Sequence, residues 1–204
     1  MSAVKKNFCI SVSYPPLDSP KGVPFLAQNR QFQWTNTGNV ILPIIPAYGA
    51  TALKEQGYKV IWDDAIAEKI SYKQWFRRLL KRRPNIIFIE SKTPVIKKHW
   101  PIINDIKKKL PKSIVVLMGD HVTALPEESL KNSSVDYVIT GGDYDFMMLN
   151  LVSHLTRKTP LEPGFYYRSK KNIVNSGIFA LKHHHLDSLP IIDRKLTNWQ
   201  LYGQ

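Results

Sequence analysis

The chain has 204 residues, of which 43% are hydrophobic and 22% charged, so it can form a sizeable core and is unlike a disordered or collagen-like sequence. The single cysteine, Cys9, excludes an internal disulfide and an all-cysteine metal site. The net charge of +13 fits either simple solubility or attraction to phosphates, nucleic acid or an anionic membrane. No stretch approaches the roughly 18 apolar residues of a membrane span, and the N-terminus has no apolar signal core, so we expect a cytoplasmic protein.

Short runs rich in β-branched residues alternate along the chain with longer amphipathic stretches. The predicted strands cover residues 8–14, 58–62, 85–90, 113–118 and 136–140. The predicted helices cover residues 46–56, a stretch that follows the N-cap Ser71 and ends before Pro84, and residues 95–110, 126–131 and 144–155. Pro101 is expected to kink or split the third helix. The alternation predicts an α/β fold, a doubly wound, flavodoxin-like or Rossmann-like, five-stranded parallel sheet.

Two further segments interrupt or follow this pattern. Residues 17–39 contain Pro20, Gly22, Pro24 and Gly38 and predict a long irregular segment, of a kind that is often functional. Residues 164–168 and 172–175 predict a small hairpin, and the irregular remainder predicts a linker without a capping element. We therefore expect an α/β domain over residues 1–158, followed by a hairpin and linker over residues 159–204.

The loops after four predicted strands are candidates for ligand binding, because doubly wound sheets bind ligands beyond the carboxyl ends of their strands. Many of their residues are small or hydroxylated; glycine admits a ligand to the backbone, and hydroxyls donate and accept hydrogen bonds. The candidate residues are Pro15, Pro16 and Leu17; Ser91, Lys92 and Thr93; Gly119, Asp120, His121, Val122 and Thr123; and Thr140, Gly141 and Gly142.

Several other chemistries lack their motifs. The chain has no G-x-G-x-x-G after its first strand, no G-x-x-x-x-G-K-[ST] and no G-x-S-x-G. The acidic pair Asp63 and Asp64 is expected to be solvated at the end of a strand. The run His183-His184-His185 is expected to lie in an exposed linker, because three adjacent residues cannot easily all face one metal ion.

Two blocks of sequence resemble a known family. Residues 114–128 read I-V-V-L-M-G-D-H-V-T-A-L-P-E-E and residues 135–143 read V-D-Y-V-I-T-G-G-D. They are similar to the N-terminal cobalamin-binding domain of B12-dependent radical SAM enzymes, in which Gly-Gly-x-His-x-Thr-x-x-Pro-Glu-Glu follows a strand and precedes Asp-Tyr-Val-Val-x-Gly-Glu. The P-P-L after the first strand, the helix-to-strand junction at residues 50–60, and L-D-x-L-P with Asp193-Arg194 add to the resemblance.

The resemblance implies that these loops line a crevice for the nucleotide tail of cobalamin and one edge of its corrin ring. The residues that carry over are Ser91, Thr93, Gly119, His121, Thr123 and Gly141. Three departures from the family pattern stand out: Met118 replaces the first glycine of the pair, Asp120 adds a negative charge, and Gly142-Asp143 replaces the usual glutamate. The D-x-H-x-x-G motif that places histidine on cobalt is absent, so no protein histidine is expected on cobalt and no metal site is assigned.

The resemblance also implies a function. A radical SAM enzyme needs three cysteine thiolates for its 4Fe-4S cluster, and this chain has one cysteine. We therefore expect an N-terminal fragment, inactive alone, that holds cobalamin open toward a missing radical SAM domain, which would use the cluster and S-adenosylmethionine. Methyl transfer is the expected reaction of the parent enzyme, although other branches of the family form rings or alter porphyrin precursors. A stand-alone cobalamin module is the other possibility.

Two alternatives from other classes remain open at this point. One is a Rossmann-like binding module that takes a different ligand or whose crevice is vestigial. The other is a nucleic-acid-binding domain, in which basic residues on two successive helices would contact phosphates. Those basic residues are Lys73, Arg77, Arg78, Lys81, Arg82, Arg83, Lys97, Lys98, Lys107, Lys108, Lys109 and Lys112.

Overall fold

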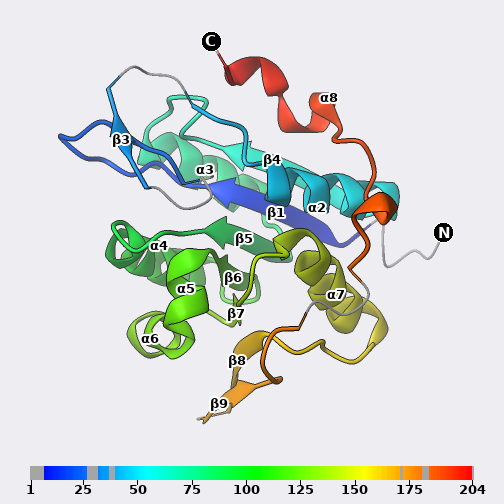
Figure 1. Ribbon diagram of the computed structural model, residues 1–204. Coiled ribbons are helices and arrows are strands. Elements are labelled where there is room, and N and C mark those ends of the chain that lie inside the picture. Colours follow the sequence, from blue (N-terminus) through cyan, green and yellow to red (C-terminus); the bar gives the residue numbers. More distant parts are fainter. Residues whose placement is uncertain (1–6, 27–31, 37–39, 171, 181–183, 204) are drawn as a thin grey trace.

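The computed structural model describes residues 7–26, 32–36, 40–170, 172–180 and 184–203. In these ranges the main sheet has seven strands in the order β4-β1-β5-β6-β7-β8-β9, with helices packed against it (Figure 1). The chain is therefore an α/β protein with a predominantly parallel sheet, as the sequence predicts.

The parallel part of the sheet contains the predicted strands, each shifted by no more than a few residues. These are β1 (Cys9–Tyr14), β4 (Lys59–Asp64), β5 (Ile86–Glu90), β6 (Ile114–Met118) and β7 (Tyr137–Ile139). Strand β5 is buried at every residue, because helices cover both faces of the sheet, which explains why its apolar residues are consecutive and do not alternate.

The predicted hairpin extends this same sheet. It consists of β8 (Phe165–Ser169) and β9 (Asn172–Asn175). Strand β8 pairs antiparallel with β7, with Val138 opposite Tyr166, and β9 pairs with β8. The five parallel strands are thus continued by two antiparallel ones, and the hairpin packs as part of the α/β unit.

The helices lie on both faces because the chain reverses direction across the sheet. The connection from β1 through α2 (Ile44–Glu55) leads to the edge strand β4, whereas the connections through α3 (Tyr72–Arg82) and α4 (Ile96–Lys109) lead the other way. Right-handed crossovers in opposite directions place their helices on opposite faces. Helix α7 (Tyr144–Arg157) packs beside α2, where a Cβ on Gly49 would come within 3.0 Å of the Cα of Asp145 (Figure 1).

Local sequence signals account for the helix boundaries. Ser71 caps α3 in a reciprocal capping box with Gln74, and Trp75 and Leu79 form the buried part of the predicted apolar stripe. Of the two predicted effects of Pro101, a kink or a split, the split is wrong, since α4 runs unbroken from Ile96 to Lys109. Its buried side continues past the proline through Ile102, Ile103 and Ile106, and this packing offsets the backbone hydrogen bond that proline cannot make.

Three segments that the sequence predicts to be irregular contain short elements. In the first, β2 (Val23–Pro24) pairs antiparallel with β3 (Trp34–Thr35); residues 27–31 and 37–39 lie outside the described part. In the second, helix α5 (Asp120–Ala124) begins directly after β6, where a loop was expected before α6 (Pro126–Asn132).

The third segment is the predicted linker, which folds back onto the domain. It contains η1 (Leu186–Ser188), α8 (Arg194–Thr197) and η2 (Trp199–Leu201), drawn in orange and red in Figure 1. Asp193 caps α8 by accepting hydrogen bonds from two backbone N–H groups. The backbone N–H of Asp193 also donates to Thr51 Oγ1 on α2, at 3.0 Å.

Among the helices in the described ranges, none has both the length and the apolar character that a transmembrane helix requires.

Candidate functional site

The strand order locates the switch point of the sheet between β1 and β5. Strand β1 lies between β4 and β5, and the chain passes first to β4 and then back across β1 to β5. In folds of this kind, ligands bind where the connections diverge, beyond the carboxyl ends of those two strands. The predicted loops that begin at Pro15 and Ser91 leave the sheet at this point.

The space between the ends of β1 and β5 is occupied by the last residues of the two strands. The hydroxyl of Tyr14 donates a hydrogen bond to Glu90 Oε2 at 2.7 Å, and the two residues are 2% and 4% exposed. The ring of Tyr14 also packs 5.9 Å from that of Trp62. Burial raises the pKa of Glu90 to about 7. Sequence reasoning named the loop residues after Tyr14 and missed Tyr14 and Glu90 as the residues that fill this point.

An ion pair between a buried lysine and an exposed aspartate lies next to this point, toward β6. Lys92 Nζ lies 2.5 Å from Asp120 Oδ2, and the Lys92 side chain is 6% exposed whereas that of Asp120 is 52% exposed. Tyr144, at the start of α7, is also buried, and its pKa is raised by burial and by the charges of Glu90 and Asp120. Side chains from β1, β5, α5 and α7 therefore lie near one another at the strand ends.

Gly119 serves the packing of two loops. Its φ is +125°, and a Cβ added there would lie 2.0 Å from the carbonyl oxygen of Ser91. The Ser91 hydroxyl in turn lies 2.6 Å from Nδ1 of His99 on α4, and both residues are fully buried. Burial lowers the pKa of His99 to about 3 and keeps its ring neutral. Gly119 and Ser91, both predicted to contact ligand, thus hold the ends of β5 and β6 together.

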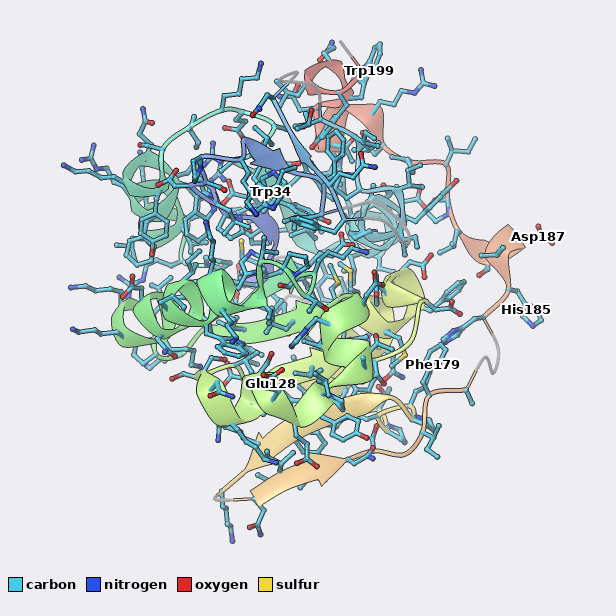
Figure 2. The ribbon with its side chains drawn as sticks, turned by 60° about the vertical axis from the view of Figure 1, so that its left-hand side comes forward. Trp34, Glu128, Phe179, His185, Asp187 and Trp199 are labelled. Carbon is cyan, nitrogen blue, oxygen red and sulfur yellow. The ribbon has the colours of Figure 1, made fainter. Side chains whose placement is uncertain are left out.

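His121, which is part of α5, contacts a side chain of the loop after β5 and a side chain of α6. Its Nδ1 lies 3.2 Å from Thr93 Oγ1, and its Nε2 lies 2.9 Å from a carboxylate oxygen of Glu128, which Figure 2 labels on α6. Val122 is fully buried. The hydroxyl of Thr140 is also internal, since it donates to the carbonyl oxygen of Gly164 at 2.8 Å.

A group of predicted residues remains accessible on the rim beyond β5, β6 and β7. We call this group the shelf; it consists of Thr93, Asp120, Thr123, Gly141 and Gly142. The hydroxyl of Thr123 contacts the carbonyl oxygens of Gly119 and Gly141, at 2.9 and 3.3 Å, and so links two strand-end loops. A Cβ added at Gly142 would meet no heavy atom within 4 Å, so the shelf is open there. By contrast, Pro15 and Leu17 are buried and Pro16 is half-buried.

One border of the shelf is formed by the segment that follows β9. A Cβ added at Gly141, whose φ is +87°, would lie 2.5 Å from the ring of Phe179 (labelled in Figure 2). His184 anchors this segment: its Nδ1 lies 2.8 Å from Asp143 Oδ2, its Nε2 lies 2.9 Å from Glu162 Oε2, and its ring stacks on Phe146.

The exposed position predicted for the histidine run is therefore wrong for His184, whose side chain is 4% exposed. Burial tends to lower its pKa, but the hydrogen bonds and charges of Asp143 and Glu162 outweigh burial and raise it. His185 is exposed, as expected, and His183 lies outside the described residues.

The prediction of a solvated acidic pair at the end of β4 is wrong. Asp63 is fully buried and forms ion pairs with Arg78, at 2.5 Å, and with Arg82, at 2.9 Å. Asp64 accepts a hydrogen bond from the hydroxyl of Tyr202 at 2.8 Å, and burial raises its pKa to about 6. The sequence pattern did not reveal these contacts because they join β4 to α3 and to the C-terminal segment.

These ion pairs also involve basic residues that were predicted to contact phosphates. Arg78 and Arg82 point toward Asp63, and Lys107 forms an ion pair with Asp136 at 2.8 Å. Part of the predicted basic surface is thus neutralised by carboxylates of the chain itself.

Together, the strand order and the strand-end rim define the class of doubly wound α/β domains that bind a ligand at the carboxyl ends of their strands. No protein-family model matches the chain. Two similar solved structures are the radical S-adenosylmethionine methyltransferase TsrM from Kitasatospora setae, with cobalamin and a 4Fe-4S cluster bound, and the apo form of the cobalamin-dependent S-adenosylmethionine radical enzyme OxsB.

The match to TsrM has a TM-score of 0.61 at 15% identity and covers 88% of this chain and 30% of TsrM. The match to OxsB has a TM-score of 0.66 at 15% identity and covers 98% of this chain and 25% of OxsB. Another TsrM structure holds its tryptophan substrate and an S-adenosylmethionine analogue. The resemblance to B12-dependent radical SAM enzymes is therefore confirmed at the level of the fold.

One curated protein is also similar in sequence. It is the anaerobic magnesium-protoporphyrin IX monomethyl ester cyclase of Rubrivivax gelatinosus, 28% identical over 164 residues, which are 77% of this chain and 28% of the cyclase. The chain thus spans less than a third of the length of each of these three proteins.

Proposed function

We propose that the chain is a cobalamin-binding domain of a B12-dependent radical SAM enzyme. The observation that carries this proposal is the open shelf beyond β5, β6 and β7, built from the residues of the family motif, on a fold shared with TsrM and OxsB. We also propose that residues 1–158 form the binding unit and that residues 159–204 lead toward the radical SAM domain, with the hairpin added to the sheet.

The shelf residues fit the edge of a corrin ring. Corrinoids carry neutral amide groups around the ring, and these groups both donate and accept hydrogen bonds. The exposed carboxylate of Asp120 can accept from an amide N–H, and the hydroxyls of Thr93 and Thr123 can pair with amide oxygen or nitrogen. The open backbone at Gly142 allows a large planar ligand to approach closely.

The role of the protein residues is to bind and orient the cofactor. When bound, cobalamin supplies the cobalt centre on which the chemistry of the parent enzyme depends. Thr123 is positioned by the carbonyl oxygens of Gly119 and Gly141, and His121 links α5 to the loop after β5, so the shelf is rigid before any ligand arrives. A rigid site loses little conformational entropy on binding.

The reaction of the longer protein is a further part of the proposal. The fold shared with TsrM favours a methyltransferase, and the sequence similarity to the cyclase favours ring formation on a porphyrin precursor. Either reaction would use a 4Fe-4S cluster and S-adenosylmethionine held by a radical SAM domain, the proposed partner of this chain. Methyl transfer is our first choice, because TsrM matches a larger part of the chain.

Retention of hydroxocobalamin tests this function. The purified chain is mixed with hydroxocobalamin and desalted, and its visible spectrum is recorded. We expect a retained corrinoid band that is lost in Thr123→Trp, which places a bulky ring on the shelf. Lys73→Trp, at an exposed position on α3, is the matched control and should retain the band. No retention by the native chain, or equal retention by both variants, would contradict the proposal.

A further inference from the structure

The switch point of this sheet, unlike the shelf, is filled by buried side chains, and this affects how a corrinoid can bind. The resemblance implies a slot between the strand ends for the nucleotide tail of cobalamin. In this chain, the hydrogen bond between Tyr14 and Glu90 spans the gap between β1 and β5, and both side chains are buried. The gap that a tail would enter is therefore filled by the last side chains of the two strands.

The neighbouring side chains close the same space from the other directions. The ammonium group of Lys92 forms an ion pair with Asp120, and Tyr144, the first residue of α7, is buried. Leu17, a predicted ligand-binding residue, is 7% exposed and belongs to the hydrophobic core. Side chains from β1, β5, α5 and α7 thus lie near one another at the switch point, where Tyr14 contacts Glu90 and the charges of Glu90 and Asp120 act on Tyr144.

Tyr14 also borders a cavity that is lined by Leu26, Val40 and Asp64 and does not include Glu90, and this cavity is far too small for a nucleotide. The cavity that borders Tyr14 and Asp64 has a volume of about 20 Å³. That is room for about one water molecule, whereas a drug-sized ligand occupies a pocket of about 300–1,000 Å³. Admitting the tail would require the Tyr14 ring to leave its place and Glu90 to lose its hydrogen bond.

Charge also disfavours the tail at this point. The nucleotide tail carries a phosphodiester anion, and the buried ammonium group of Lys92 is already paired with Asp120. An anion that is buried without a partner is strongly disfavoured. The amide groups of the corrin ring carry no net charge and meet no such penalty on the shelf.

The following inference rests on the proposed function. We propose that this chain recognises a corrinoid by the corrin ring, which lies on the shelf, and that the nucleotide tail stays outside the switch point. Tyr14 and Glu90 are then specificity-determining residues, because they exclude the tail from the sheet. The ligand class is accordingly wider than cobalamin and includes corrinoids that lack the nucleotide.

Comparing two corrinoids tests this inference directly. The dissociation constants of hydroxocobalamin and of hydroxocobinamide, which lacks the nucleotide tail, are measured on the native chain by absorbance after equilibrium dialysis. We expect the two constants to agree within about threefold. A preference of about 100-fold or more for cobalamin would overturn the inference and leave the proposed function intact. Binding of neither corrinoid would overturn the proposed function, and the inference with it.

Two variants at Tyr14 then test whether its ring excludes the nucleotide tail. Tyr14→Ala removes the ring and should shift the ratio toward cobalamin by about tenfold, since the tail gains access to the strand ends. Tyr14→Phe keeps the ring and removes the hydrogen bond, so it should leave the ratio unchanged. An unchanged ratio in folded Tyr14→Ala would overturn the role given to Tyr14. If that variant does not fold, as judged by circular dichroism, the comparison on the native chain decides.

Discussion

The switch point between β1 and β5 and the shelf beyond β6 and β7 lie on the same rim of the sheet, yet they differ in openness. At the switch point, Tyr14 and Glu90 are buried and hydrogen-bonded to each other. On the shelf, Thr123 is exposed and a Cβ at Gly142 would meet open space.

The difference shows that the residue ending a strand matters as much as the loop after it. Tyr14 and Glu90 are large, and they end neighbouring parallel strands whose carboxyl ends meet at one edge. Their side chains therefore reach each other and fill the gap. Strands β6 and β7 end with Met118 and Ile139, which are buried, and Thr123 and Gly142 in the segments after them stay exposed.

The largest effect is expected where the two regions join, at Gly119. In Gly119→Ala, the added Cβ would collide with the backbone of Ser91, and alanine does not readily adopt a φ of +125°. We expect the free energy of unfolding to fall by about 3 kcal/mol or more, as measured by urea denaturation.

Gly142→Ala is the matched control for that substitution. The same methyl group is added at a glycine of the neighbouring loop, where it meets no heavy atom within 4 Å. The free energy of unfolding should change by no more than about 0.5 kcal/mol. Equal destabilisation by the two variants would remove the distinction between a packed rim and an open one.

An intermediate effect, dependent on pH, is expected at Glu90. Burial raises the pKa of this carboxyl to about 7, so between about pH 4.5 and 7 the folded state keeps a proton that the unfolded state has lost. Stability should therefore fall as the pH rises through this range. Glu90→Gln removes the titration, and its stability relative to the native chain should rise by on the order of 2 kcal/mol between pH 4.5 and 8.

Urea midpoints at several pH values measure this dependence. The variant should keep a smaller decline of the same sign, because burial also raises the pKa of Asp64, to about 6. Parallel stability curves for Glu90→Gln and the native chain would show that Glu90 is not held protonated at the switch point.

The smallest effect is expected at Thr123 on the shelf. Thr123→Val removes the hydroxyl that contacts the carbonyl oxygens of Gly119 and Gly141 but keeps the shape of the side chain. Since the residue is exposed and water can replace the hydroxyl, the free energy of unfolding should fall by only about 1 kcal/mol in urea denaturation. Thr123→Ser keeps the hydroxyl and should stay within about 0.5 kcal/mol of the native chain; a larger loss in Ser than in Val would contradict this role.

Most of the fold could be predicted from the sequence because its signals are local. Runs such as residues 86–90 are apolar at every position, which is typical of strands covered on both faces, and the capping box at Ser71 marks the start of α3. The pairing of β8 with β7 was not predicted, since hairpin residues alone do not tell which edge they join.

The candidate site was predictable in position but not in detail. The motif around Gly119 and the loop at Thr93 were correctly located at the carboxyl ends of the strands. Which of these residues are exposed could not be predicted, because exposure depends on contacts between segments far apart in the chain. Phe179, for example, covers Gly141 from 38 residues away along the sequence.

By itself, the sequence determined the alternation of strands and helices, the doubly wound class of sheet that this alternation implies, and the rim on which a ligand would lie. The first two follow from periodicity and turn residues, which act between chain neighbours, and the third from the rule that such sheets bind ligands beyond the carboxyl ends of their strands. Only the tertiary structure decided that Asp63 and His184 are buried and paired, and that Tyr14 closes the switch point. Burial and pairing of such groups depend on which distant side chains come within a few ångströms, and only the packed chain determines that.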